Sequence, residues 1–322
     1  MSFWGARGGT LRLLAVNAVL LVLLFGALFA GFEIYCRYFD DTTDSFSLTR
    51  ASVRWFKRYY HTNAAGFRDT FDYPLKKQPG IKRITFIGDS FTAGHGIKNP
   101  DDRFANLIRK KLGAEWEVHV LAQNGWDLGQ EINLLHEAIG KGYELDQVIL
   151  VYTLNDISDI VPEWQEIVKR IYADTDHLPF WVRHSYFMNS LYFRWRARKN
   201  PDISNYYHFV QKAYEGDLWE KQKNRLKNFT EEVTAHGGKS FVVIFPFLHP
   251  MPKGYEYASV HKNLGQFLRE INVPYLDLLT VYKDFLPWNL TVNRHDAHPN
   301  EWAHRLAAEK ILPFLESASH AA

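Results

Sequence analysis

The chain has 322 residues, of which 46% are hydrophobic and 16% aromatic, and its formal net charge is +2. This composition excludes a disordered chain, and the presence of a single cysteine excludes a scaffold held by disulfides. The near balance of 38 basic and 36 acidic side chains gives no indication of a nucleic-acid partner. A chain of this length can bury the core of one large domain or of two small ones.

The N-terminal region contains an apolar stretch over residues 13–32 that has no charged side chain. A helix of this length spans about 30 Å, which matches the hydrocarbon core of a bilayer. Arg7 and Arg12 precede the stretch, whereas mainly acidic residues, beginning with Glu33, follow it. The positive charge on the N-terminal side predicts a single-pass transmembrane anchor with a cytoplasmic tail, 1–12, and the rest of the chain in the periplasm or outside the cell.

A cleaved signal peptide is the alternative interpretation of this stretch. The apolar region of a signal peptide is shorter, about 7–15 residues, and small residues precede its cleavage site. Leu28 and Ala30 fit that pattern poorly, so we favour an uncleaved anchor. Residues 33–60 then form a juxtamembrane segment, in which Cys36 is a lone thiol with no second cysteine to pair with, and residues 61–322 form the exported domain.

Apolar runs of strand length alternate with helical patterns over the rest of the chain. Helical periodicity covers 103–112 and 130–139, and a longer pattern, 219–236, ends before a glycine pair. Near-continuous apolar strands that alternate with helices predict a parallel sheet covered on both faces. We therefore expect an α/β fold, a doubly wound, flavodoxin-like, five-stranded parallel sheet preceded by the transmembrane helix. The predicted strands are 83–87, 116–121, 147–152, 240–245 and 273–278.

Polar residues follow the predicted strands at their carboxyl ends, where folds of this class bind ligands. Together they supply a hydroxyl, a backbone N–H beside a glycine, a side-chain amide, and an imidazole with a carboxylate. Nucleophilic catalysis requires these groups as nucleophile, oxyanion donors, base and orienter of the base. The residues are Gly88, Asp89 and Ser90 after the first strand, Asn124 and Gly125 after the second, Asn155 and Asp156 after the third, and His295, Asp296 and His298 after the last.

Four of these motifs stand in the order found in one known family. The segments ITFIGDSFTAGHG (84–96), Asn124-Gly125 with Gly129, Leu154-Asn155-Asp156 and DAHPN (296–300) together resemble the SGNH, or GDSL-type, hydrolases. Segment 63–68 (NAAGFR) also looks like the stretch that precedes the nucleophile in membrane-anchored members. The resemblance covers about residues 61–156 and 237–315, and it implies the SGNH hydrolase fold and a serine mechanism.

The resemblance also implies a role for each matching residue. Ser90 would be the nucleophile, and His298 would be the general base and acid, held in its tautomer by Asp296. The oxyanion hole would combine the backbone N–H groups of Ser90 and Gly125 with the side chain of Asn155.

Two positions depart from the family pattern. The glycine that usually stands two residues before the asparagine is Thr153 here, which we expect to narrow the approach to the oxyanion hole. The acid usually stands three residues before the histidine, whereas Asp296 stands two before it and His295 occupies the usual place. A D-x-H spacing is compatible with a loop, so we retain Asp296 as the acid, with Asp277 as a distant substitute.

Other interpretations of the same residues stay open at this stage. Ser90 could cap a helix that begins directly after the first strand. A histidine-rich cluster that includes His298 and His304 could hold a metal, but residues six apart do not share a helical face as i, i+4 ligands do. We therefore predict neither a metal nor a cofactor. The substrate-pocket candidates are His95, which follows the nucleophile in a glycine-rich turn, Asn124 and Thr153.

Residues 157–218 form an insertion that is too long for a simple loop and is rich in tryptophan and tyrosine. Within it, segment 180–199 has basic side chains but no acidic one. This composition suits a membrane surface or the stacking of sugar rings, but we favour a lid helix whose aromatic side chains pack on the core. Because the insertion directly follows the third strand, it should overhang the site and shape the choice of substrate.

These expectations combine into a membrane-anchored serine esterase that hydrolyses acyl esters, with an O-acetyl group on a carbohydrate or exopolysaccharide as the expected substrate. The carbohydrate is implied only by the resemblance and by the external location. Three alternatives remain: an O-acyltransferase that uses the same residues, a metal-dependent hydrolase, and a non-catalytic carbohydrate-binding or assembly module.

Overall fold

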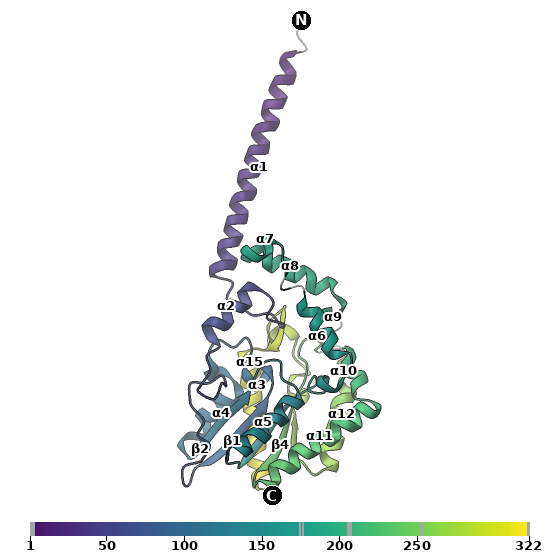
Figure 1. Cartoon of the computed structure of the whole chain (residues 1–322). Coiled ribbons are helices and arrows are strands. Elements are labelled where there is room, and N and C mark those ends of the chain that lie inside the picture. The colour runs from purple at the N-terminus through teal and green to yellow at the C-terminus, as the bar shows by residue number, and fades with distance from the viewer. Residues whose placement is uncertain (1–3, 174, 176, 205–207, 252–253, 321–322) are drawn as a thin grey trace.

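A five-stranded sheet forms the centre of the domain in the computed structural model, which describes residues 4–173, 175, 177–204, 208–251 and 254–320. All of its strands are parallel, in the order β2-β1-β3-β4-β5, which confirms the doubly wound α/β fold (Figure 1). The strands are β1 (Lys82–Gly88), β2 (Trp116–Ala122), β3 (Gln147–Thr153), β4 (Lys239–Phe245) and β5 (Tyr275–Asp277). A separate antiparallel pair consists of β6 (Thr291–Asn293) and β7 (Asp296–Pro299).

Helices cover both faces of the sheet, because successive strand residues point to opposite faces and both faces are apolar. Leu150 belongs to the core beneath α5, α11 and α12, whereas its neighbour Ile149 belongs to the core beneath α3, α4 and α15. The helices that bound these cores are α3 (Ser90–Ala93), α4 (Phe104–Leu112), α5 (Leu128–Gly140), α11 (Gly216–Ala235), α12 (Ala258–Glu270) and α15 (Glu301–His320). Short helices complete the connections: η1 (Pro100–Asp102), η2 (Gly113–Glu115), α13 (Leu279–Tyr282) and α14 (Pro287–Leu290).

One long helix, α1 (Trp4–Tyr38), projects from the domain, with the C-terminus at the far end of the molecule (Figure 1). Its stretch Thr10–Tyr38 is the one helix among the described residues that is long and apolar enough to cross a membrane. None of its most apolar part is buried against the rest of the chain. The predicted apolar helix is therefore present and stands clear of the sheet domain.

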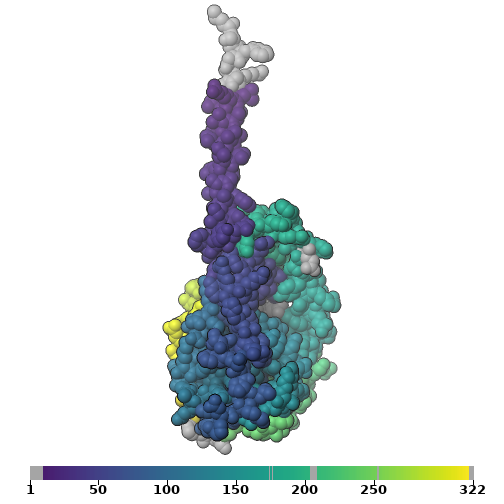
Figure 2. All heavy atoms as spheres, turned by 60° about the vertical axis from the view of Figure 1, so that its left-hand side comes forward, coloured from purple at the N-terminus to yellow at the C-terminus, as the bar shows by residue number. Residues whose placement is uncertain are grey.

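The segment after α1 belongs to the domain and is not a free spacer. It contains α2 (Arg50–Tyr59), whose Trp55 is completely buried, and Thr43 is buried ahead of it. Figure 2 shows this part of the chain lying over the domain below the purple helix. The residues that follow α1 thus pack with the sheet unit instead of separating it from that helix.

The insertion after β3 is helical. Its elements are η3 (Ser158–Ile160), α6 (Trp164–Ala173), α7 (Phe180–His184), α8 (Tyr186–Lys199), α9 (Pro201–Ser204) and α10 (His208–Ala213). They lie at the end of the domain from which α1 projects (Figure 1). The insertion therefore contacts both the sheet domain and the end of the long helix.

Candidate active site

The loop after β1 places Ser90 at the carboxyl edge of the sheet. Gly88 is required there, since a Cβ at this position would lie 2.3 Å from Thr92 Oγ1 and 3.1 Å from the Val151 carbonyl oxygen. Asp89 is the N-cap residue of α3, and its side chain accepts a hydrogen bond from the Phe91 N–H. Because Asp89 caps the helix, the Ser90 hydroxyl is free to contact another group.

Ser90, His298 and Asp296 form a hydrogen-bonded chain. The Ser90 Oγ lies 2.9 Å from His298 Nε2, and His298 Nδ1 lies 2.5 Å from Asp296 Oδ1. Because a carboxylate only accepts, Nδ1 carries the proton, which leaves Nε2 to accept the serine proton. The structure thus joins three residues that lie as many as 208 positions apart in the sequence.

The pKa shifts in this hydrogen-bonded series favour a neutral His298 beside an ionised Asp296. Burial lowers the pKa of His298, and the neighbouring His95 lowers it further against the attraction of Asp296. Burial alone would raise the pKa of Asp296, but His95 and His298 outweigh it and hold that pKa well below its usual value. At neutral pH His298 is therefore ready to accept a proton, and Asp296 is ionised.

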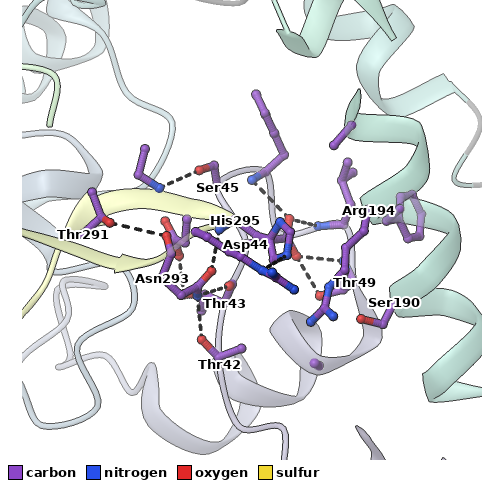
Figure 3. A pocket seen from close by; sticks show the side chains of 18 of the residues that line it. Thr42, Thr43, Asp44, Ser45, Thr49, Ser190, Arg194, Thr291, Asn293 and His295 are labelled. Atoms are coloured by element: carbon purple, nitrogen blue, oxygen red, sulfur yellow. Dashed lines mark hydrogen bonds between the residues drawn. The ribbon is translucent and has the colours of Figure 1, made fainter. Parts of the chain in front are cut away.

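His295 occupies the usual place of the acid in the sequence but lines a different cavity from the one beside Ser90. The backbone N–H of His295 donates to Asn293 Oδ1 at 2.7 Å. Both residues belong to the β6–β7 hairpin, whose strand register is irregular. In Figure 3, His295 lies with Asn293 and Arg194 around a second cavity of about 720 Å³. Burial and the nearby arginines, Arg194 first among them, lower the pKa of His295 to about 4. Asp296 and His298 stand two residues apart in β7, so their side chains lie on the same face of the strand, which explains how a D-x-H spacing brings them together.

The distant substitute, Asp277, is engaged elsewhere. Its Oδ1 lies 2.8 Å from Nδ1 of His261 and accepts from the Leu279 N–H. It therefore belongs to the packing of α12 on β5 and does not contact His298.

Two further residues hold the second oxygen of Asp296. The Thr43 hydroxyl donates to Oδ2, and His95 Nε2 lies 3.3 Å from the same oxygen. His95 Nε2 is also 3.2 Å from the Asp44 carbonyl oxygen; since both neighbours are acceptors, this nitrogen carries a proton. The His95 ring stacks on His298 with centroids 3.9 Å apart. His95, predicted as a pocket residue, is thus also a support of the acid.

Thr43 was not a predicted site residue, because no motif marks it. Its partner Asp296 lies 253 positions away, and only the folded chain brings the two together. The neighbouring backbone is held as well, because the Ala297 N–H donates to Ser45 Oγ at 2.9 Å and Asn293 Nδ2 donates to the Thr43 carbonyl oxygen at 3.0 Å (Figure 3). The segment after α1 is therefore a wall of the site.

A cavity of about 640 Å³ opens beside Ser90 and His298. Asn124, Gly125 and Asn155, the candidates from the next two strand ends, line it. Gly125 has φ +79°, a left-handed conformation that favours glycine. Helix α6 supplies further wall residues, so the insertion does overhang the cavity.

Thr153 lies behind this cavity and is not among the residues that line it. It is completely buried, and its hydroxyl is within hydrogen-bond distance of Asp89, Asp156 and the Asn155 side-chain oxygen. Where the family usually has glycine, this threonine links the loop after β1 to the loop after β3. Its effect on the site is to orient Asn155 and not to narrow the approach.

Arg68 organises the turn that carries His95. Its guanidinium is buried and donates to the Tyr59 carbonyl oxygen at 3.1 Å, to that of Ala93 at 3.3 Å, and to that of Gly94. The sequence segment 63–68 contained this residue, but its pattern did not show which groups the side chain would meet. Burial, with Arg103 nearby, lowers the pKa of Arg68 to about 9, so it remains a cation at neutral pH.

A group of buried carboxyl side chains lies beneath the nucleophile loop. Burial raises the pKa of Asp89 to about 6 and that of Asp127, near Asp159, to about 7. Glu131 is completely buried, neither of its carboxyl oxygens has a hydrogen-bond partner within the described chain, and burial followed by Asp89 and Asp127 raises its pKa well above the usual value. Burial therefore favours the protonated form of Glu131.

The residues with metal-ligand chemistry at this site are His95, Asp296 and His298, whose ligand atoms lie within 4.8 Å of one another. Both nitrogens of His298 already face Ser90 and Asp296, so a metal ligand role would require breaking one of those bonds. His304, the other histidine considered for a metal, is buried, and its Nδ1 accepts from the Phe104 N–H at 3.3 Å. The donor set fits a proton relay better than a metal centre.

Comparison with known proteins identifies the family. The sequence profile of the GDSL-like lipase/acylhydrolase family matches residues 86–306. The chain belongs to this family. In this GDSL-family protein the matched range includes Ser90, Asp296 and His298, whereas Thr43 and Arg68 precede it. Thr43 and Arg68 thus lie outside the range that the family profile matches, whereas His95 lies within it.

Solved structures with a similar fold include several hydrolases. TesA is 13% identical and covers 73% of this chain and 99% of its own, with a TM-score of 0.46. The psychrotrophic esterase EstA from a Pseudoalteromonas species is 15% identical and covers 74% of this chain and 99% of its own, with a TM-score of 0.45. A two-domain esterase active on acetylated mannans is 16% identical and covers 74% of this chain but 49% of its own, with a TM-score of 0.40. Curated protein sequences give no match to this GDSL-family chain.

Proposed function

We propose that this GDSL-family protein is a serine ester hydrolase in which Ser90 is the nucleophile, His298 the general base and acid, and Asp296 the residue that orients it. The observation that supports the proposal best is the continuous contact from Ser90 Oγ through His298 to Asp296, at 2.9 and 2.5 Å. This arrangement lies at the mouth of a cavity at the carboxyl edge of the sheet. Family membership supports hydrolase chemistry in general.

The proposed reaction has two halves. Ser90 Oγ attacks the ester carbonyl carbon while His298 Nε2 takes the hydroxyl proton, and the same proton passes to the alkoxide that leaves. Water then attacks the acyl-enzyme, again with His298 as the base, and releases the carboxylic acid and free Ser90. The backbone N–H groups of Ser90 and Gly125 and the Asn155 side chain would stabilise the oxyanion, each donor contributing roughly 2.7–4 kcal/mol.

The proposed substrate is an O-acetyl ester on a carbohydrate or exopolysaccharide. This part of the proposal follows from the family resemblance together with an external location of the domain. For that location, we propose that residues 13–32 of α1 are an uncleaved anchor, with residues 1–12 in the cytoplasm and the sheet domain in the periplasm or outside the cell. We propose 61–322 as the hydrolase domain, with the packed segment 33–60 attached to it.

Hydrolysis of p-nitrophenyl acetate by the full chain in detergent tests the chemistry. Ser90→Ala should abolish the activity, whereas Ser317→Ala, on the exposed surface of α15, should leave it unchanged. Activity that survives Ser90→Ala would contradict the proposal. The same assay with a sugar acceptor separates the two reactions by their products, a free acid from hydrolysis and an acylated sugar from acyl transfer. Loss of activity in the presence of a chelator would favour a metal mechanism instead.

A further inference from the structure

The end of α1 is joined to the start of α8 by a carboxylate cap. Glu33 accepts hydrogen bonds from the N–H groups of Tyr186 and Phe187, at 3.1 and 2.9 Å, and from Ser185 Oγ at 2.7 Å. A helix N-terminus has unpaired N–H groups and a positive dipole end, so a carboxylate stabilises it. The first turn of α8 is therefore fixed to the residue that directly follows the apolar stretch 13–32.

Aromatic contacts reinforce this junction. The Phe187 ring stacks on Phe32 with centroids 5.0 Å apart and meets the edge of Phe29 at 5.8 Å. The guanidinium groups of Arg37 and Arg50 lie 5.0 and 4.6 Å from the Tyr186 ring centroid. Hence α8 contacts the last turns of the apolar stretch itself and not only the polar segment after it.

Helix α7 and one face of α8 expose large apolar side chains beside this junction. Phe180 is 77% exposed, Trp181 is 50% exposed, and Leu191 and Trp195 on α8 are also exposed. Side chains of this size are normally buried in a soluble domain, and a group of them on one surface marks an interaction site. In Figure 1, α7 stands beside the lower part of α1, at the end of the domain nearest to the apolar stretch.

We propose that α7 and the first turns of α8 lie in the headgroup region of the bilayer that α1 crosses. This inference rests on the proposed anchor and does not depend on the esterase activity. Phe29 and Phe32 end the apolar stretch, so the groups that touch them lie at the depth where the hydrocarbon core gives way to the headgroups. Amphipathic elements at this depth insert about 5–10 Å into the boundary.

The composition of α7 and α8 favours lipid over a protein partner. Tryptophan and phenylalanine are suited to the boundary between water and hydrocarbon. Segment 180–199 has no acidic side chain, and Arg183, on the exposed surface of α7, would be attracted to anionic headgroups. The surface is also continuous with the helix proposed to cross the membrane. We therefore commit to the lipid surface as the occupant.

Site-specific quenching by spin-labelled lipid tests the proposal on the full chain. Cys36 is the single cysteine, so a Cys36→Ser background accepts one fluorescent label at a chosen position. Phe180→Cys places the label on α7, and Ser317→Cys is the matched control on the exposed surface of α15, five residues before the C-terminus, which Figure 1 marks at the end of the molecule opposite α1. The vesicles contain phosphatidylcholine and phosphatidylglycerol with a nitroxide near the headgroup.

We expect strong quenching of the label at position 180 and none above background at position 317. Trp195→Cys, further along α8, should give an intermediate value. Equal signals at 180 and 317 would overturn the proposal and leave α7 facing solvent or a protein. A label at Leu20→Cys, read in vesicles whose nitroxide is near the middle of the bilayer on the acyl chains, reports the anchor separately: its quenching shows that α1 is inserted, and its absence would overturn both the anchor and the docking. Hydrolysis of p-nitrophenyl acetate by the same labelled samples tests the esterase proposal independently.

Discussion

Two regions of the molecule meet at Asp296, and only one of them is marked by motifs in the sequence. On one side, Ser90 and His298 stand in short motifs at the ends of sheet elements, within the range 86–306 that the family shares. On the other side, Thr43 stands in the segment after α1, where no motif marks it, yet it donates to the same carboxylate. The reacting groups therefore come from motifs inside the family match, whereas one of the groups that hold them, Thr43, comes from the segment that precedes it.

The largest expected effect concerns which residue is the acid. Asp296→Asn should lower kcat/KM by about 10⁴-fold, because an amide at this position would favour the wrong tautomer of His298. His295→Asn is the matched control, since His295 holds the usual position in the sequence but faces the other cavity. Ester hydrolysis by the two variants decides the matter, and an equal loss in both would show that the D-x-H assignment is wrong.

The next effect tests the turn that carries His95. Arg68→Met should lower the free energy of unfolding by about 3 kcal/mol, because buried carbonyl groups lose a charged donor. Chemical denaturation measures this, with Arg58→Met as a control, since Arg58 is a largely exposed arginine on α2. A change no larger than that of the control would mean that the turn holds its shape without Arg68.

A smaller effect on activity should follow the loss of the Thr43 hydroxyl. Thr43→Val should lower kcat/KM by about tenfold, as expected for one hydrogen bond to a charged group. With one donor fewer, the Asp296 carboxylate should also attract the imidazolium more strongly, so the acid limb of the pH profile should move to higher pH. Thr70→Val, at an exposed threonine, is the control. A loss of activity without a shift of that limb would reduce Thr43 to a packing residue.

The sequence predicted most of one region and little of the other. The five strands and their ends are readable because apolar runs and turn residues are local signals. The assignment of Asp296 as the acid stays a prediction, and the structure places Asp296 and His298 in strand β7 and not in a loop. The roles of Thr43 and Arg68 depend on contacts between segments that are far apart in the chain, and such contacts leave no periodic pattern in the sequence. The sequence likewise did not show that the Thr153 hydroxyl lies within hydrogen-bond distance of Asp89, Asn155 and Asp156, because these groups are brought together only in the folded loops.

The smallest expected effect concerns Glu131, which is buried beneath the site, and it is an effect on stability alone. Burial raises the pKa of Glu131, so the folded chain releases this proton at a higher pH than the unfolded chain does, and the group lowers stability as the pH rises above about 4. Glu131→Gln should therefore raise Tm at pH 8 and weaken the fall of Tm with pH. Thermal unfolding in detergent measures this, and Glu309→Gln on the exposed surface of α15 is the control. A steeper fall in the Glu131 variant would contradict the assignment of a buried neutral acid.

The central claim is that His298 and Asp296 activate Ser90, and covalent labelling tests it without knowledge of the substrate. A fluorophosphonate probe should modify the full chain at the peptide that contains Ser90, since only an activated serine attacks such a phosphorus centre rapidly. Labelling should disappear in Ser90→Ala and fall steeply in His298→Ala. Labelling at another residue, or at Ser90 with undiminished rate in His298→Ala, would contradict the account.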